Sequence, residues 1–254
     1  MNNWNLTGKR ALVTGSSKGI GFAAACEIGL LGAEVCLIAR NEPGLQAAID
    51  ELEQLGIQVW GIAADVSHPR DQQRVLENTL SRWDRLDILV NNTGMNIRKS
   101  YADYEESEYR RVFETNLFSA MAMTQLLFPL LKASGNASVV NVASVAGLVD
   151  VRSGAPYGMT KAGLIQMTRH LAVEWAPLGI RVNAVSPWYT RTPLAEPVLQ
   201  QPDRLALILN NTPMGRIAEA GEVAAAIAFL CMDKASYITG QNLVVDGGMT
   251  AQGM

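Results

Sequence analysis

The 254-residue sequence predicts an α/β fold in which helices cover both faces of one doubly wound, seven-stranded parallel sheet. Short apolar runs alternate with longer helical patterns along the whole chain. Most of these runs are almost continuously apolar, as is typical of strands covered on both faces. A composition of 48% hydrophobic and 18% charged residues suits a compact chain of this kind. We therefore expect right-handed crossover connections and a single domain over residues 1–254.

The predicted elements follow one another in a regular order. Strands are expected at the short β-rich runs, which occupy residues 11–15, 34–39, 59–65, 86–92, 137–144, 180–186 and 242–248. Helices are expected between them, at roughly residues 19–31, 43–55, 69–83, 105–132, 156–176 and 219–232. No linker or internal repeat interrupts this alternation.

One long stretch departs from the pattern. Residues 187–213 contain four prolines after Pro187, at positions 193, 197, 202 and 213, and these break up any long helix. The stretch follows the carboxyl end of a predicted strand, where sheets of this type bind their ligands. We therefore expect a substrate lid near residues 190–213, the alternative being a surface excursion packed for stability.

Charge and cysteine content exclude several classes of partner. A net charge of −3 gives no field that would collect nucleic acid, and no apolar run approaches the roughly 20 residues that span a membrane. Cys26, Cys36 and Cys231 lack the spacing of metal ligands, so we expect no metal. With no secretory signal visible, free thiols favour a cytoplasmic protein.

A glycine-rich loop joins the first predicted strand to the first predicted helix, in the run TGSSKGIG. Gly15 permits a tight turn, while Gly19 and Gly21 let the backbone approach a phosphate and let the helix approach the sheet. Free N–H groups and the helix dipole favour a pyrophosphate at this point. Glycines also serve turns that bind nothing, so it is the place of the loop in a βαβ unit that indicates a dinucleotide site.

The end of the second strand indicates which dinucleotide binds. A site for NAD usually has an acidic residue there, whereas this chain has Ala39 followed by Arg40. The Arg40 guanidinium can bind a 2′-phosphate, and Lys18 in the glycine loop can add a second charge. The pattern favours an NADP(H) site over the alternative, in which Arg40 and Lys18 are merely solvated cations on the surface. Asp65, at the end of the third strand, can accept from an adenine amino group or cap the following helix.

Tyr157 and Lys161 lie one turn apart at the start of a predicted helix, which Pro156 helps to begin. Ser144 ends the preceding strand and brings a hydroxyl to the same edge of the sheet. A tyrosine has a pKa near 10, and a nearby ammonium together with a positive nicotinamide ring would favour its phenolate. In ketone reduction the phenol would protonate the carbonyl oxygen while Ser144 steadies the developing alkoxide.

These features together resemble the short-chain dehydrogenase/reductase family, with its Rossmann-type fold, along essentially the whole chain. The matching residues are Thr14, Gly15, Gly19, Gly21, Asp65, Asn91, Asn92, Gly94, Asn116, Ser144, Tyr157, Lys161, Pro187 and the run 246–248. Local strings such as ARN at 39–41 and ASYITGQ at 235–241 are similar to those of tropinone reductases. That branch is NADP-dependent and reduces a small bicyclic ketone, and the family is mostly tetrameric, so a homotetramer or homodimer is expected.

The resemblance also implies roles for single residues. Asn116, otherwise read as a core asparagine, would hold a water that links Lys161 to solvent in a proton relay. Lys161 would bond the nicotinamide ribose, and Thr190 and Thr192 would contact the carboxamide. The further cofactor contacts that the resemblance implies are Ser17, Ile20, Val66, Asn91, Gly94, Tyr157 and Pro187.

Two residues depart from the family pattern, and both lie near the expected site. Thr93 replaces an alanine, and Trp188 replaces a glycine where its indole can wall the substrate pocket. Fold analogy assigns to this pocket the residues Ser144, Val145, Leu148, Val149, Tyr157, Trp188, Leu194 and Leu199. A largely apolar wall favours small cyclic ketones. The alternatives are a 3-oxoacyl-thioester reductase, a sugar-acid or polyol dehydrogenase and, more distantly, a non-catalytic NADP-binding regulator.

Overall fold

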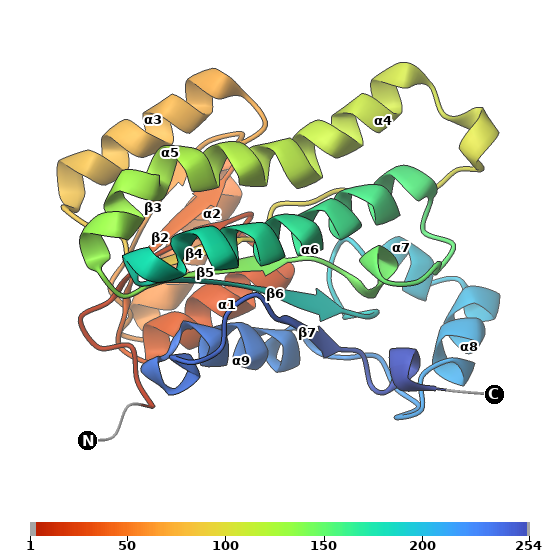
Figure 1. Ribbon diagram of the computed structural model, residues 1–254. Helices are drawn as coiled ribbons and strands as arrows, with labels where there is room; N and C mark the ends of the chain where they lie inside the picture. The colour runs from red at the N-terminus through yellow and green to blue at the C-terminus, as the bar shows by residue number, and fades with distance from the viewer. Residues whose placement is uncertain (1–3, 253–254) are drawn as a thin grey trace.

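A parallel sheet of seven strands lies at the centre of the computed structural model, which describes residues 4–252 (Figure 1). The strands are β1 (Arg10–Thr14), β2 (Glu34–Ala39), β3 (Val59–Ala63), β4 (Ile88–Asn91), β5 (Ala137–Val142), β6 (Ile180–Pro187) and β7 (Asn242–Val245). Their order is β3-β2-β1-β4-β5-β6-β7, and every neighbouring pair is parallel. The predicted fold class is therefore confirmed.

Helices cover both faces of this sheet, as the alternating pattern predicts (Figure 1). One face carries α1 (Gly19–Leu30), α2 (Glu42–Gln54) and α9 (Ala220–Cys231). The other carries α3 (Pro69–Arg82), α5 (Ser119–Ser134) and α6 (Ala155–Trp175). The inner strands β4, β5 and β6 are buried along their whole length, so most of their residues are apolar, and the polar ones, such as Asn141 and Asn183, are buried too.

A π-helical turn interrupts the long helix that the sequence predicts over 105–132. The structure has α4 (Glu106–Phe113), then a π-helix over Glu114–Phe118, then α5. By length and composition alone, the continuous stretch Glu106–Ser134 could cross a membrane. Its α5 part instead packs Met123, Leu127 and Leu131 into the core beside the sheet, as the central helix of a globular domain does.

The stretch after β6 forms a small layer of its own beside the carboxyl ends of the strands (Figure 1). It contains two short helices, α7 (Glu196–Leu199) and α8 (Pro202–Asn210), each with a proline in its first turn. Val198, Leu199 and Ile208 form a separate apolar cluster, against which Trp188 packs. The prolines thus limit helix length as predicted, and the layer lies where the lid was expected.

Candidate active site

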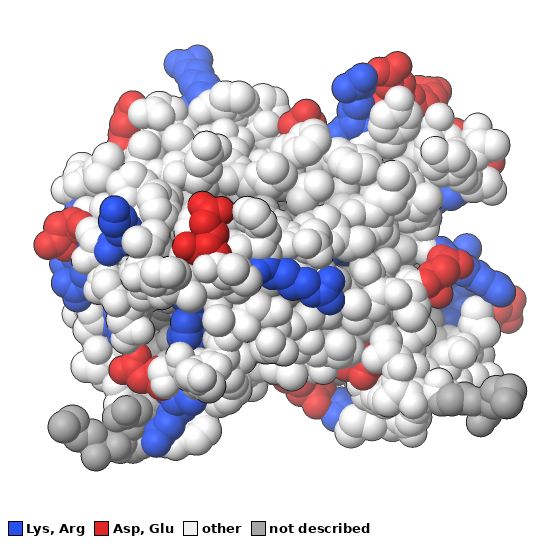
Figure 2. Space-filling model, in the orientation of Figure 1, with Lys and Arg blue, Asp and Glu red and all other residues white. Residues whose placement is uncertain are grey.

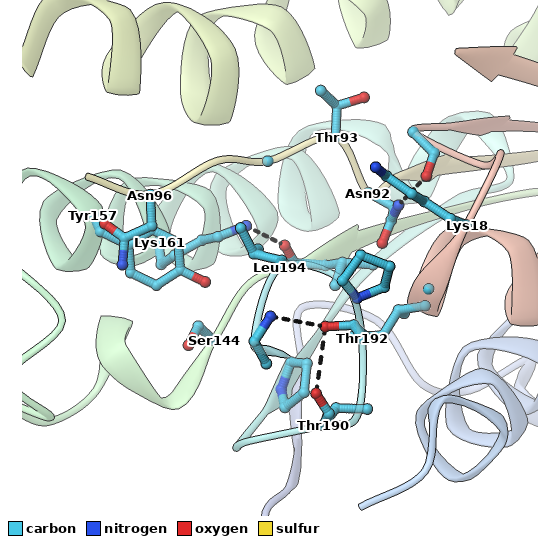
Figure 3. A pocket seen from close by; sticks show the side chains of 18 of the residues that line it. Lys18, Asn92, Thr93, Asn96, Ser144, Tyr157, Lys161, Thr190, Thr192 and Leu194 are labelled. Carbon is cyan, nitrogen blue, oxygen red and sulfur yellow. Dashed lines mark hydrogen bonds between the residues drawn. The ribbon is translucent and has the colours of Figure 1, made fainter. Parts of the chain in front are cut away.

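A cavity of about 520 Å³ opens at the carboxyl ends of the strands and extends from the glycine loop to the start of α6. Its volume falls in the range of small-molecule and cofactor sites. Figure 3 shows Lys18 on one side of the cavity and Ser144, Tyr157 and Lys161 on the other. The nucleotide motif and the tyrosine motif therefore meet in one space.

The glycine loop has the geometry that a phosphate cradle needs. Gly15 and Gly19 have φ values of 64° and 61°, a region that favours glycine, and both line the cavity. Asn92 Nδ2 donates to the carbonyl oxygens of Thr14 and Gly15 at 3.1 and 2.9 Å, which fixes the turn. No side chain caps the amino end of α1, so its N–H groups remain available to an anion.

Most of the other residues assigned to the cofactor also line the cavity. These are Ser17, Lys18, Ile20, Arg40, Asp65, Val66, Gly94, Tyr157, Lys161, Pro187, Thr190 and Thr192. Gly21 and Asn91 do not. A Cβ on Gly21 would collide with Asn92 and the Gly15 carbonyl, so this glycine serves close packing of helix on loop. Asn91 is buried and donates to Thr124 and Asn141, so it lies within the core.

Arg40 and Asp65 form an ion pair where β2 and β3 end, with Nη1 and Oδ2 3.5 Å apart. Asp65 Oδ1 also accepts from the backbone N–H and the hydroxyl of Ser67, at 3.0 and 2.7 Å. Partial burial opposes ionisation, yet the Ser67 hydrogen bonds and the Arg40 charge lower the pKa of Asp65. Asp65 thus shapes the turn before α3 and lines the cavity, where it can still accept from an adenine amino group; it does not cap α3, whose N-cap is His68. Arg40 is 62% exposed and can turn toward a phosphate.

The catalytic candidates come from the end of β5 and the first two turns of α6. Ser144 Oγ accepts from the N–H of Ala146 at 3.1 Å, which fixes its side chain at the strand end. Lys161 Nζ donates to the Val142 carbonyl at 2.8 Å and lies 5.7 Å from the centre of the Tyr157 ring. The structure thus brings Ser144, Tyr157 and Lys161 together on the cavity wall.

Burial controls the protonation of this group. It raises the pKa of Tyr157, against the lowering effects of the Ser144 hydroxyl and the Arg98 charge. Burial also lowers the pKa of Lys161, to about 8. Tyr157 is therefore a neutral phenol at neutral pH, which suits a proton donor. The expected shift toward phenolate included a positive nicotinamide ring, and in the protein alone desolvation of the phenol is the larger effect.

Asn116 lies in the π-helical turn, fully buried beneath the cavity wall and not on it. Its Oδ1 accepts from the N–H of Met95, and its Nδ2 donates to the Met95 carbonyl and to Thr160. Extra turns of this kind often mark functional sites in helices. The structure connects Asn116 to the backbone around the site by these hydrogen bonds.

The wall around Ser144 and Tyr157 differs in part from the expected one. Trp188 and Leu194 line it as expected, but Val145, Leu148, Val149 and Leu199 do not. Leu148 and Val149 are exposed to solvent, Val145 is buried, and Leu199 is buried in the apolar cluster that follows β6.

Sequence reasoning missed further residues of this wall, among them Asn96, Arg98, Val151, Ser153 and Tyr189. Asn96 and Arg98 belong to the run MNIRKS, which begins shortly after β4 ends, and this position beyond a strand end was the signal that could have identified them. In residues 4–252, no group of three or more His, Cys, Asp or Glu side chains could hold a metal ion.

Trp188 joins this wall to the lid. Its Nε1 donates to Thr212 Oγ1 at 3.0 Å, and its ring meets that of Tyr189 edge to face at 4.7 Å. Thr190 and Thr192 follow on the same strand end and hydrogen-bond within the turn. The indole therefore connects the end of β6 to the end of α8.

Comparison with known proteins identifies this arrangement. A protein-family description, enoyl-(acyl carrier protein) reductase, matches residues 15–250. A tropinone reductase homolog of Arabidopsis thaliana is 43% identical over 98% of this chain and 95% of its own length. The chain belongs to the short-chain dehydrogenase/reductase family. The resemblance inferred from the motifs is thus confirmed.

Other members of the family extend the comparison. The senescence-associated protein 13 of Arabidopsis thaliana is 45% identical over 99% of this chain and 94% of its own. A crystal structure of gluconate 5-dehydrogenase from Burkholderia cenocepacia, in complex with NADP and tartrate, superposes with a TM-score of 0.95. It is 27% identical, with 99% of each chain covered. This short-chain dehydrogenase/reductase is therefore an oxidoreductase with the family's fold.

Proposed function

We propose that the chain is an NADPH-dependent carbonyl reductase that reversibly reduces small cyclic ketones to alcohols. The observation that carries this proposal is the meeting of two motifs in one cavity. Ser144, Tyr157 and Lys161 line it together with Gly15 and Gly19 of the glycine loop. Carbonyl reduction needs a bound dinucleotide as the hydride source and a proton donor next to it, and this cavity has residues for both.

Each catalytic candidate has a separate task in this proposal. A bound nicotinamide supplies the hydride that the carbonyl carbon accepts. Tyr157, a neutral phenol at neutral pH, gives its proton to the carbonyl oxygen, and the Ser144 hydroxyl donates to the same oxygen as charge develops. Lys161, whose Nζ donates to the Val142 carbonyl, binds the cofactor ribose. Its ammonium also favours the transfer of a new proton to Tyr157 after the phenol has given up its own. Asn116 holds the backbone next to this path.

The preference for NADPH rests on charge at the nucleotide end of the cavity. Arg40 and Lys18 both line it, and position 39 carries no acid. A 2′-phosphate can pair with the exposed guanidinium of Arg40, whereas a carboxylate there would repel it. The NADP complex of the gluconate 5-dehydrogenase supports the same choice.

The substrate class follows from the relatives and from the apolar part of the wall. Trp188, Leu194 and Val151 offer ring-sized apolar surface, and the Arabidopsis relative is a tropinone reductase homolog. The polar residues Asn96 and Arg98 favour a second candidate, a sugar-acid dehydrogenase, as does the likeness to gluconate 5-dehydrogenase. A thioester reductase is the third, supported by the matching family description.

One assay separates these candidates. NADPH and NADH consumption is measured with cyclic ketones, 3-oxoacyl thioesters and keto-sugar acids, using wild type, Tyr157→Phe and the surface control Tyr101→Phe. We expect turnover of cyclic ketones with NADPH, a loss of about 10²–10⁴-fold in Tyr157→Phe with NADPH affinity retained, and no change in the control. Retained turnover in Tyr157→Phe would contradict the mechanism. NADPH binding without turnover of any carbonyl would support a regulator.

Association into a homotetramer or homodimer belongs to the same proposal. The face in Figure 2 carries scattered charges of both signs and wide uncharged areas. Phe118 and Met121, at the start of α5, and Met159 and Val173 of α6 are exposed. Light scattering on a size-exclusion column tests this.

The free thiols of Cys26, Cys36 and Cys231 suit the reducing cytoplasm, which we propose as the compartment of this protein.

A further inference from the structure

We propose that Arg98 binds an anionic group of the substrate, so that the preferred ketone is a ring that carries a carboxylate or a similar anion away from its carbonyl. This inference rests on the proposed function, because it takes the cavity as the substrate pocket. It refines the substrate class from a small cyclic ketone to an oxo-acid of that size.

Arg98 is a cation of this cavity without an acidic partner. It lines the wall near Tyr157 and takes part in no ion pair among residues 4–252. The charge of its neighbour Lys99 is balanced by an ion pair, because Lys99 Nζ donates to both carboxylate oxygens of Glu108 at 2.5 and 2.7 Å. The only acidic side chain on the described cavity wall is Asp65, which pairs with Arg40 at the nucleotide end.

The loop that presents Arg98 is fixed at the three residues before it. The backbone N–H of Met95 donates to Asn116 Oδ1 at 2.8 Å, and its carbonyl accepts from Asn116 Nδ2 at 2.9 Å. Asn96 Nδ2 donates to the Ser153 carbonyl at 3.0 Å, and the Ile97 carbonyl accepts from the Tyr104 hydroxyl. The backbone of Arg98 is thus held relative to the start of α6. Such a loop reduces the ordering cost of binding a ligand.

The charge of Arg98 also acts on Tyr157, because it opposes the rise in the pKa of that phenol that burial causes. A guanidinium binds a carboxylate through paired N–H donors, and such bonds are stronger than neutral ones. Beside it, Val151, Trp188 and Leu194 supply the apolar surface for a ring. The wall therefore suits a molecule that is apolar in its body and anionic at one end.

Three ketones of similar size test the charge preference. They are 4-oxocyclohexanecarboxylate, the neutral 4-methylcyclohexanone, and 1-methyl-4-piperidone, which is a cation at pH 7. We measure kcat/KM with NADPH for wild type, Arg98→Gln, Arg98→Lys and Arg98→Glu, with Arg111→Gln on the surface of α4 as the matched control. The ratio of anionic to neutral substrate is the readout, because an effect of Arg98 on Tyr157 changes both values equally and cancels.

We expect wild type to prefer the carboxylate and Arg98→Gln to lower the anionic-to-neutral ratio about 10- to 100-fold. Arg98→Lys should keep part of the preference, Arg98→Glu should turn it toward the piperidone, and Arg111→Gln should leave it unchanged. An equal loss for all three ketones, or an unchanged ratio, would overturn the inference and leave the reductase assignment intact.

A binding measurement separates this inference from the proposed function. Calorimetry with NADP present compares cyclohexanecarboxylate with the isosteric cyclohexanecarboxamide, in wild type and in Arg98→Gln. Tighter binding of the carboxylate that is lost in Arg98→Gln supports the anion site, even if no ketone is reduced and the reductase assignment fails. Equal binding of acid and amide to wild type argues against the anion site.

Discussion

Asn116 and Met95 exchange two hydrogen bonds behind the cavity wall: the Met95 N–H donates to Asn116 Oδ1 at 2.8 Å, and Asn116 Nδ2 donates to the Met95 carbonyl at 2.9 Å. The same amide group donates to Thr160 Oγ1 at 3.3 Å, on the helix that carries Tyr157 and Lys161. One buried side chain in the π-helical turn thus holds the loop after β4 against α6.

Asn116→Ala should therefore lower both stability and activity. It removes the partner of the N–H and of the carbonyl of the partly buried Met95, which costs about 1–3 kcal/mol for each group that water does not reach. We expect a lower free energy of unfolding in urea and a lower kcat with any accepted ketone. Asn78→Ala, which removes an exposed amide on α3, is the control. Wild-type stability in Asn116→Ala would show that the two bonds contribute little.

Arg40→Asp should reverse the cofactor preference. The guanidinium lies at the end of β2 and can turn from Asp65 toward a 2′-phosphate, whereas a carboxylate there repels it and can accept from a ribose 2′-hydroxyl. We expect NADPH to bind at least about 10- to 100-fold more weakly, with NADH affinity unchanged or higher. Fluorescence titration of both cofactors measures this, with Arg169→Asp on α6 as the control. Equal NADPH and NADH affinities in wild type would refute the assignment.

Lys161→Met should stabilise the protein at neutral pH at the expense of activity. Burial lowers the pKa of Lys161 from 10.5 to about 8. Between these values the unfolded chain binds more protons, so the penalty for the buried charge is full below pH 8 and is lost as the pH rises toward 10.5. The penalty is about 3 kcal/mol, and losing the hydrogen bond to Val142 offsets about 1 kcal/mol of it.

Unfolding by urea at pH 7 and at pH 10, without cofactor, tests the sign of this effect. Lys161→Met should be more stable than wild type by about 1–2 kcal/mol at pH 7, and this advantage should shrink or vanish at pH 10. Lys132→Met, at the exposed end of α5, controls for the loss of a positive charge. A destabilised Lys161→Met at pH 7 would mean that its hydrogen bond outweighs the cost of burial.

The sequence predicts the sheet and the chemical motifs well, for a physical reason. Strands buried on both faces are mostly apolar, and a phosphate turn requires glycine, so β5 and the Gly15–Gly21 loop can be recognised from the sequence alone. These are local constraints. They place Ser144, Tyr157 and Lys161 at one sheet edge without any knowledge of packing between distant segments.

The cavity wall around Ser144 and Tyr157 could not be predicted in this way, because it depends on which side of a loop faces the cavity. Leu148 and Val149 were assigned to the wall but do not line the cavity, while Arg98, which the sequence did not single out, is exposed and lines it. The π-helical turn was hidden too. Its amino acids fit an ordinary helix, and the bonds between Asn116 and Met95 join segments 21 residues apart.

Trp188 and Thr212 should be energetically coupled, because the indole N–H donates to the threonine hydroxyl at 3.0 Å and so ties the lid to β6. A double-mutant cycle with Trp188→Phe and Thr212→Val should give a coupling of about 0.5–1.5 kcal/mol in the free energy of unfolding. Trp188→Phe should also raise KM more than it lowers kcat, since the indole lines the cavity wall and takes no part in proton transfer from Tyr157. The parallel cycle with Asn211→Ala, whose amide bonds only to Leu207, should be additive. Additivity in both cycles would mean that this hydrogen bond does not contribute to holding the lid, which then depends on its apolar cluster and its backbone hydrogen bonds.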